Sequence, residues 1–73
     1  MIIFFDSGMK SIPYEDSALS CVPILDGTSK YAINAWFSGR EFELASLDDY
    51  KTAVNKFGEM KEAYEKGVKS YYL

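Results

Sequence analysis

The sequence predicts a single α+β domain, in which a mostly antiparallel β-meander of about four strands packs on one long C-terminal helix. Short β-branched and aromatic stretches separated by turn residues fill the chain up to residue 45, and residues 46–67 carry an apolar repeat of helical spacing. With only 73 residues, the chain is too short for more than one core. Its 48% hydrophobic and 26% charged residues are typical of a folded globular protein.

The first strand is expected at residues 2–5, "IIFF", which are β-branched and aromatic. It ends at the turn cluster "DSG", where Gly8 can adopt a positive φ. Pro13 lacks an N–H group and restricts its neighbour, so any strand in the following segment is short, irregular or at a sheet edge.

Residues 18–25 are apolar enough for the next strand, although Pro23 favours an edge position or a bulge. The dipeptide of Asp26 and Gly27 then predicts a hairpin turn.

A second hairpin is predicted from residues 30–37 and 40–45, which are separated by Ser38 and Gly39. Pairing of Phe37 with Arg40 sets the register of the hairpin. The pairs that follow are Trp36 with Glu41, Ala35 with Phe42, Asn34 with Glu43, and Ile33 with Leu44. Because side chains alternate across a strand, one face should carry Tyr31, Ile33, Ala35, Phe37, Phe42 and Leu44. The opposite, polar face should carry Ala32, Asn34, Trp36, Glu41 and Glu43.

The helix is expected to begin after Ser46, which with Asp49 resembles a capping box. Its apolar stripe, expected to cover the Ile33/Phe42 face of the sheet, comprises Tyr50, Ala53, Val54, Phe57, Met60 and Tyr64. Phe57 is placed in the core, where its truncation to Ala should cost about 3 to 5 kcal/mol.

The end of the helix is predicted at Gly67, in the C′ position. Gly58 lies inside the stripe and predicts a bend or a break. Two ion pairs with i,i+4 spacing are expected on the outer side, namely Glu62 with Lys66 and Glu65 with Lys69. Residues 68–73 are compatible with a last short strand or with a tail.

The layout resembles a group of small uncharacterised phage and prophage proteins of Gram-positive bacteria. "MIIFFDSGMKSI" resembles their opening strand and turn, and "KYAINAWFSGREFELASLDDYKTAV" resembles their closing unit of hairpin, acidic N-cap and helix. Pro13 and Pro23 depart from the pattern. The resemblance implies a β-meander followed by a helix, and it implies no catalytic residues.

Composition excludes several classes of function. A net charge of −3 and a pI near 4.7 argue against nucleic-acid binding, which requires a basic surface. Cys21 is the sole cysteine and there is no histidine, so neither a disulfide, a zinc or copper site, nor a bound cofactor is expected. The apolar start is too short for a signal peptide or a membrane span, which predicts an intracellular, cytoplasmic protein.

The candidate binding surface is the polar face of the second hairpin, with Trp36 as the anchor and Asn34, Glu41 and Glu43 around it. In the competing interpretation, residues 11–18 or the C-terminal tail cover Trp36 within the monomer. Tyr71 and Tyr72 are further candidates for partner binding, although they could instead dock onto the sheet.

No enzymatic activity is predicted. Glu41 and Glu43 are paired carboxylates, but solvation alone accounts for them on an exposed strand. Asp48 and Asp49 could join Glu15 and Asp16 in a weak metal site, yet helix capping explains the first pair better, so no metal site is predicted. Cys21 is expected to be a small core residue.

The predicted function is therefore that of a non-catalytic accessory protein, of phage type, that binds another protein. A concrete version is an acidic inhibitor of a host defence nuclease, whose carboxylates compete with nucleic acid for a basic groove. One alternative is a nucleic-acid or small-ligand binder that stacks ligands on Trp36 and nearby tyrosines. Another is a self-associating structural protein, for instance a homodimer.

Overall fold

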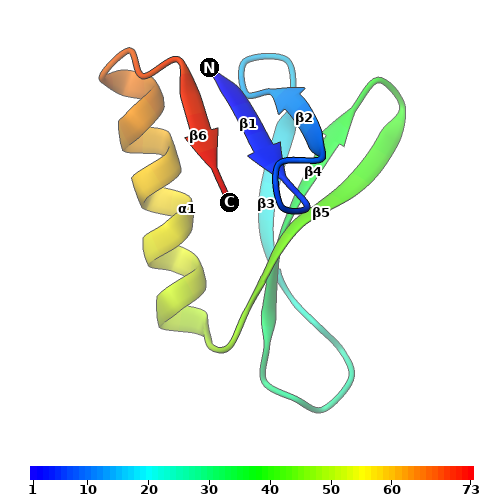
Figure 1. Cartoon of the computed structure of the whole chain (residues 1–73). Coiled ribbons are helices and arrows are strands. Elements are labelled where there is room, and N and C mark those ends of the chain that lie inside the picture. The colour runs from blue at the N-terminus through cyan, green and yellow to red at the C-terminus, as the bar shows by residue number, and fades with distance from the viewer.

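The computed structural model describes residues 1–73, which form an α+β domain with one helix (Figure 1). The elements in chain order are β1 (Ile2–Phe5), β2 (Lys10–Pro13), β3 (Ala18–Pro23), β4 (Tyr31–Phe37), β5 (Arg40–Leu47), α1 (Tyr50–Glu65) and β6 (Ser70–Tyr72). The predicted fold class is confirmed. No helix is both long and apolar enough to cross a membrane.

The strands form two separate three-stranded sheets, in the orders β2-β1-β6 and β3-β4-β5. The sequence predicted a single meander of about four strands, whereas the structure has six strands divided between two sheets. The chain changes sheets in the short connection between β2 and β3, where Tyr14 O accepts from Ser17 N and Ser17 Oγ donates to Pro13 O at 2.5 Å. Pro13 ends β2 there, because it has no N–H with which to extend the ladder.

In the first sheet, β1 pairs antiparallel with β2 and parallel with β6. The β1–β2 turn contains Gly8 at φ 80°, the positive φ that the sequence indicated. Residues 68–73 therefore do not form a free tail: Tyr71 lies beside Ile3 and Tyr72 beside Phe4. β6 lies between α1 and β1 in Figure 1, although it is the last strand of the chain.

In the second sheet, the β4–β5 hairpin has the predicted turn, with Ser38 at φ 53° and Gly39 at φ 75°, the signs required by a type I′ turn. The predicted register holds from Phe37 to Asn34 and then fails, because Ile33 pairs with Ala45 and not with Leu44. A β-bulge inserts one extra residue into β5 at this point.

The bulge changes the alternation along β5, and this change explains why the strand extends past residue 45. Leu44 is buried on the core side, and the shifted pairing then places Leu47 opposite Tyr31, on the same side. A strand of uninterrupted alternation would send one of these two leucines to the solvent face.

The helix begins later than predicted. β5 runs through Ser46, and the N-cap is Asp49, whose side chain accepts a hydrogen bond of 2.7 Å from Thr52 N. Asp49 thus has the capping role that the sequence analysis gave to Ser46. At the other end, Gly67 (φ 80°) donates to Tyr64 O and Val68 donates to Ala63 O, which is a Schellman motif and confirms the predicted C′ glycine.

α1 continues through Gly58 without a break. Of the two expected ion pairs, Glu62 with Lys66 is present, with a distance of 2.8 Å between Oε1 and Nζ. The pair of Glu65 with Lys69 is absent, because the helix ends before Lys69 and the i,i+4 geometry no longer applies.

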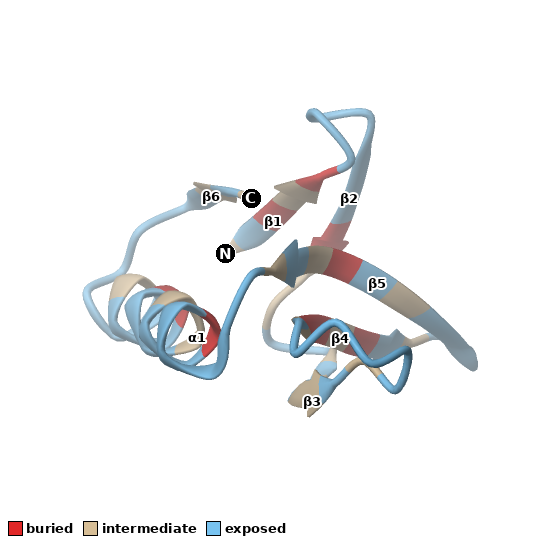
Figure 2. Ribbon diagram, turned by 90° about the horizontal axis from the view of Figure 1, so that it is seen from below, coloured by how far each residue is buried: buried red, intermediate tan, exposed pale blue.

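The core lies where the two sheets and α1 meet, as the buried segments in Figure 2 show. Its buried cluster comprises Ile3, Phe5, Ile12, Ile33, Ala35, Leu44 and Met60. The predicted core face of the hairpin is confirmed. On the helix, only Ala53 and Met60 are buried, whereas Phe57 is half-buried and packs against the edge of the cluster, so its predicted core position is confirmed only in part. Cys21 is also only half-buried.

Candidate binding surface

Trp36 lies on the solvent side of β4, the central strand of the second sheet, and its side chain is 54% exposed. Its neighbours across the sheet are Ala18 on β3 and Glu41 on β5. Because cross-strand partners project to the same face, the indole has a small side chain on one side and a carboxylate on the other. A large apolar side chain is therefore held at the surface on a strand that is paired on both sides.

Asn34 and Glu43 extend this surface along the same face. Asn34 pairs with Ser20 on β3 and with Glu43 on β5. The side-chain Oδ1 of Asn34 is shielded from solvent and accepts no hydrogen bond. Glu41 and Glu43 are exposed and take part in none of the ion pairs of the structure.

We call Trp36, Asn34, Glu41 and Glu43 the Trp36 surface. The predicted hairpin register placed these residues together, and the structure confirms that they share one face. Neither residues 11–18 nor the C-terminal segment covers the indole, which stays more than half exposed. Chemically, the surface offers an aromatic ring surrounded by hydrogen-bond acceptors, and it offers no cation.

Tyr71 and Tyr72 do not belong to this surface, because they lie on β6 in the other sheet. The Tyr71 hydroxyl donates to Glu59 Oε2 at 3.5 Å, and Lys56 Nζ lies 6.0 Å from the Tyr71 ring centroid. Tyr72 is 68% exposed and stacks on Phe4 with ring centroids 4.8 Å apart. Tyr71 thus packs on α1 and Tyr72 on β1, while most of Tyr72 stays exposed, so their role in partner binding stays a prediction.

Two of the four acidic residues considered for a metal site, Asp49 and Glu15, have other roles in the structure. Asp49 caps α1, and the backbone hydrogen bond from Thr52 lowers the pKa of its carboxyl group. Glu15 accepts from the amino group of Met1, and this hydrogen bond lowers the pKa of Glu15. No group of three or more acidic or cysteine side chains is placed to hold a metal ion.

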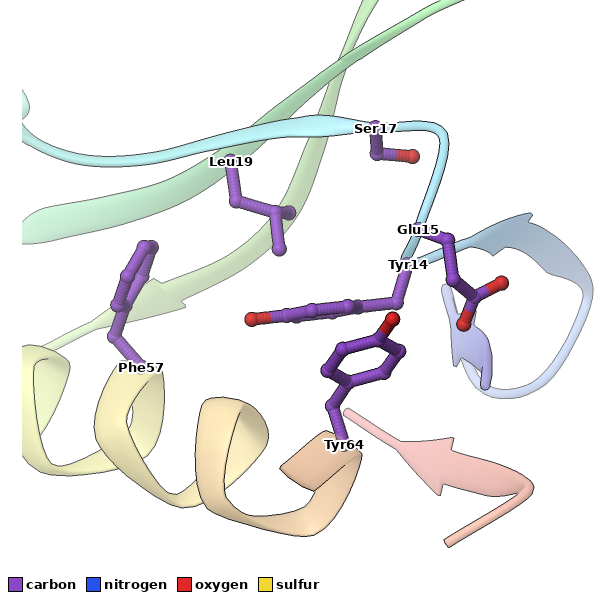
Figure 3. Close-up of a pocket in the computed structure, with 6 residues that line it drawn as sticks. All are labelled: Tyr14, Glu15, Ser17, Leu19, Phe57 and Tyr64. Atoms are coloured by element: carbon purple, nitrogen blue, oxygen red, sulfur yellow. The ribbon is translucent and has the colours of Figure 1, made fainter. Parts of the chain in front are cut away.

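A cavity that the sequence did not predict is formed by the β2–β3 connection, β3 and α1 (Figure 3). It is lined by Tyr14, Glu15, Ser17, Leu19, Phe57 and Tyr64. These residues are separated by up to fifty positions in the chain, and they meet only because α1 folds back across β3. The sequence placed Phe57 and Tyr64 on the apolar stripe of the helix, and both were predicted to pack on the sheet.

No known protein family, curated protein or solved structure matches the chain. The resemblance to phage proteins therefore stays a prediction, and any functional assignment must depend on the surfaces described above.

Proposed function

We propose that the chain is a non-catalytic protein-binding module, and that its Trp36 surface docks on a basic patch of a partner protein. The supporting observation is the position of Trp36, which is 54% exposed in the middle of a sheet. Burying an exposed tryptophan on binding removes a large apolar area from water at a low cost in conformational entropy.

The residues around Trp36 favour a partner that presents hydrogen-bond donors. Glu41 and Glu43 are carboxylates without ion-pair partners, and Asn34 Oδ1 is an acceptor without a donor. An Arg or Lys from the partner would supply donors to the two exposed carboxylates. Opposite charges on the two proteins would also speed their encounter.

Within this proposal, an acidic inhibitor of a host defence nuclease remains the concrete version, in which Glu41 and Glu43 take the place of nucleic-acid phosphates in a basic groove. The net charge of −3 agrees with that role. A cytoplasmic location agrees with the free thiol of Cys21.

The proposal is tested by capture of a partner with the full chain and its Trp36→Ala variant. If Trp36 is a binding hot spot, its loss should weaken the complex by about 2 kcal/mol, or roughly thirtyfold in Kd. Thermal stability should change little, because the indole is largely in solvent already. Tyr50→Ala is the matched control, since Tyr50 is an aromatic side chain of similar exposure (61%) on the helix.

A second pair of variants tests the charge. Replacing Glu41 and Glu43 by Gln should lower the association rate and reduce its dependence on salt. Equal capture by the parent chain, Trp36→Ala and the double Gln variant would rule out this surface as the binding site. Sub-micromolar binding to DNA or RNA at physiological salt would favour the stacking alternative instead.

A further inference from the structure

The cavity beside β3 differs in character from the Trp36 surface. It has a volume of about 320 Å³ and is open to solvent on one side. Leu19 and Phe57 form apolar walls, and Tyr14 lies beneath Leu19 with its hydroxyl end toward Phe57 (Figure 3). The Tyr14 ring stacks on Tyr64 with centroids 4.5 Å apart and an interplanar angle of 29°. The walls are thus mainly aromatic, and the aromatic rings come from two elements that pack on each other.

The polar groups of the cavity are acceptors or hydroxyls. The Tyr14 hydroxyl points toward Phe57 in Figure 3 and makes no hydrogen bond. Burial raises the pKa of Tyr14, and the nearby Glu65 carboxylate and Tyr64 raise it further. The hydroxyl is therefore neutral and able both to donate and to accept.

The charge around the cavity is negative. Glu15 lines the cavity, but its carboxylate is paired with the Met1 amino group, so the unpaired negative charge is that of Glu65, which follows Tyr64 on α1 and is not a lining residue. Glu65 has no ion-pair partner of its own. No Lys or Arg lines the cavity. Anionic ligands, including phosphates and nucleotides, are disfavoured at such a site, whereas cations are attracted.

We propose that this cavity binds the guanidinium end of an arginine side chain from a peptide or protein. A guanidinium group is planar and weakly hydrated, and it packs favourably on aromatic side chains, of which Tyr14, Phe57 and Tyr64 line the cavity. Its N–H groups can donate to the Tyr14 hydroxyl, and its methylene stem can lie along Leu19 and Phe57. The negative charge of Glu65, which follows Tyr64 on α1, attracts the guanidinium without lining the cavity. The volume is at the lower end of the range for ligand pockets, which suits one side chain and excludes a folded segment.

The cavity uses none of the residues of the Trp36 surface, so the inference stands or falls separately from the proposed function. The two sites are nevertheless near each other in the chain, because Ser17 lines the cavity and the next residue, Ala18, pairs with Trp36. They lie on opposite faces of the second sheet, because Leu19 of the cavity pairs with the buried Ala35, whereas Ala18 pairs with the exposed Trp36.

The test is an NMR titration of the ¹⁵N-labelled full chain with N-acetyl-arginine methylamide. The matched probe is the citrulline analogue, in which a neutral urea replaces the guanidinium. Saturable amide shifts are expected at Tyr14, Ser17, Leu19 and Phe57 with the arginine probe, with a Kd on the order of 1 mM. The citrulline probe should bind at least about tenfold more weakly, because it lacks the charge.

Two variants locate the binding. Glu65→Gln changes an exposed side chain and leaves the fold intact, and it should weaken arginine binding about threefold. Tyr14→Leu should abolish the saturable shifts, and its amide spectrum shows directly whether the domain is folded. Trp36→Ala should leave the Kd unchanged.

Several results would overturn the inference. Equal affinity for the arginine and citrulline probes would remove the role of charge. Shifts centred on Glu41 and Glu43 would place the probe on the Trp36 surface. Identical affinity of Glu65→Gln and the parent chain for the arginine probe would show that the negative charge near the cavity does not contribute to binding. None of these outcomes depends on whether Trp36 binds a protein partner.

Discussion

Met60 is the helix residue on which the packing of the domain depends most. Its side chain is fully buried in the cluster that joins α1 to both sheets. Met60→Ala removes the Cγ, Sδ and Cε atoms, at roughly 0.8 kcal/mol of transfer free energy for each buried group. The cavity left behind adds to this, so the total loss should be about 2 to 5 kcal/mol. A domain of 73 residues has only about 4 to 11 kcal/mol of stability to lose.

The assay is thermal unfolding followed by far-UV circular dichroism. The melting temperature should fall by at least about 8 °C, since 1 kcal/mol shifts a domain of this size by roughly 4 to 8 °C. Met9→Ala is the control, because Met9 is 81% exposed and its truncation should change the melting temperature by very little. Met60→Leu keeps the side-chain volume and should cost less than about 1.5 kcal/mol, which separates lost volume from lost sulfur. Equal melting temperatures for Met60→Ala and Met9→Ala would refute the placement of α1 against the core.

The remaining predictions concern glycines, the helix cap and the indole. Gly58→Ala should stabilise the domain by about 1 kcal/mol, because no atom lies within 4 Å of the added Cβ. Gly67→Ala should destabilise it by about 1 to 2 kcal/mol, because the φ of Gly67 is 80°. If chemical denaturation shows that both variants change stability in the same direction, the helix bounds are contradicted. The pKa of Asp49 is lowered in the fold, so its contribution is present above the unfolded-state pKa and is lost as the pH falls through the folded-state pKa. Asp49→Asn should therefore keep the cap but flatten the acid limb of a melting-temperature profile, and an unchanged profile would argue against the Thr52 hydrogen bond. Trp36 emission should be red-shifted and quenched by acrylamide at all protein concentrations, and a blue shift on concentration would reveal a second copy of the chain on this face.

Local features of the chain were predicted well, because each depends on residues adjacent in sequence. Ser38 and Gly39 determine a two-residue turn, and that turn alone sets the register that puts Trp36 and Glu41 on the solvent face. Gly67 ends α1 because the C′ position requires a positive φ. The exposed Trp36 surface therefore followed from turn geometry and from the alternation of side chains along a strand.

The errors at Ser46 and Leu44 have a common origin. A serine, two aspartates and a threonine all occur near the start of α1, and sequence alone does not decide which residue caps it. Extension of β5 to Leu47 decides the cap in favour of Asp49, and that extension depends on the bulge at Leu44. The bulge itself is favoured by the burial of Leu44 and Leu47 on one side, which is a property of the packed sheet.

The amino-acid sequence by itself determined the fold class, the turns, the helix and the polar face that carries Trp36, because short-range geometry specifies all of them. Tertiary structure alone decided the division into two sheets, the parallel pairing of β6 with β1, and the cavity formed by Tyr14, Phe57 and Tyr64. These features join segments far apart in the chain, and the free energy that selects them comes from burial in a shared core, which no local pattern of residues encodes.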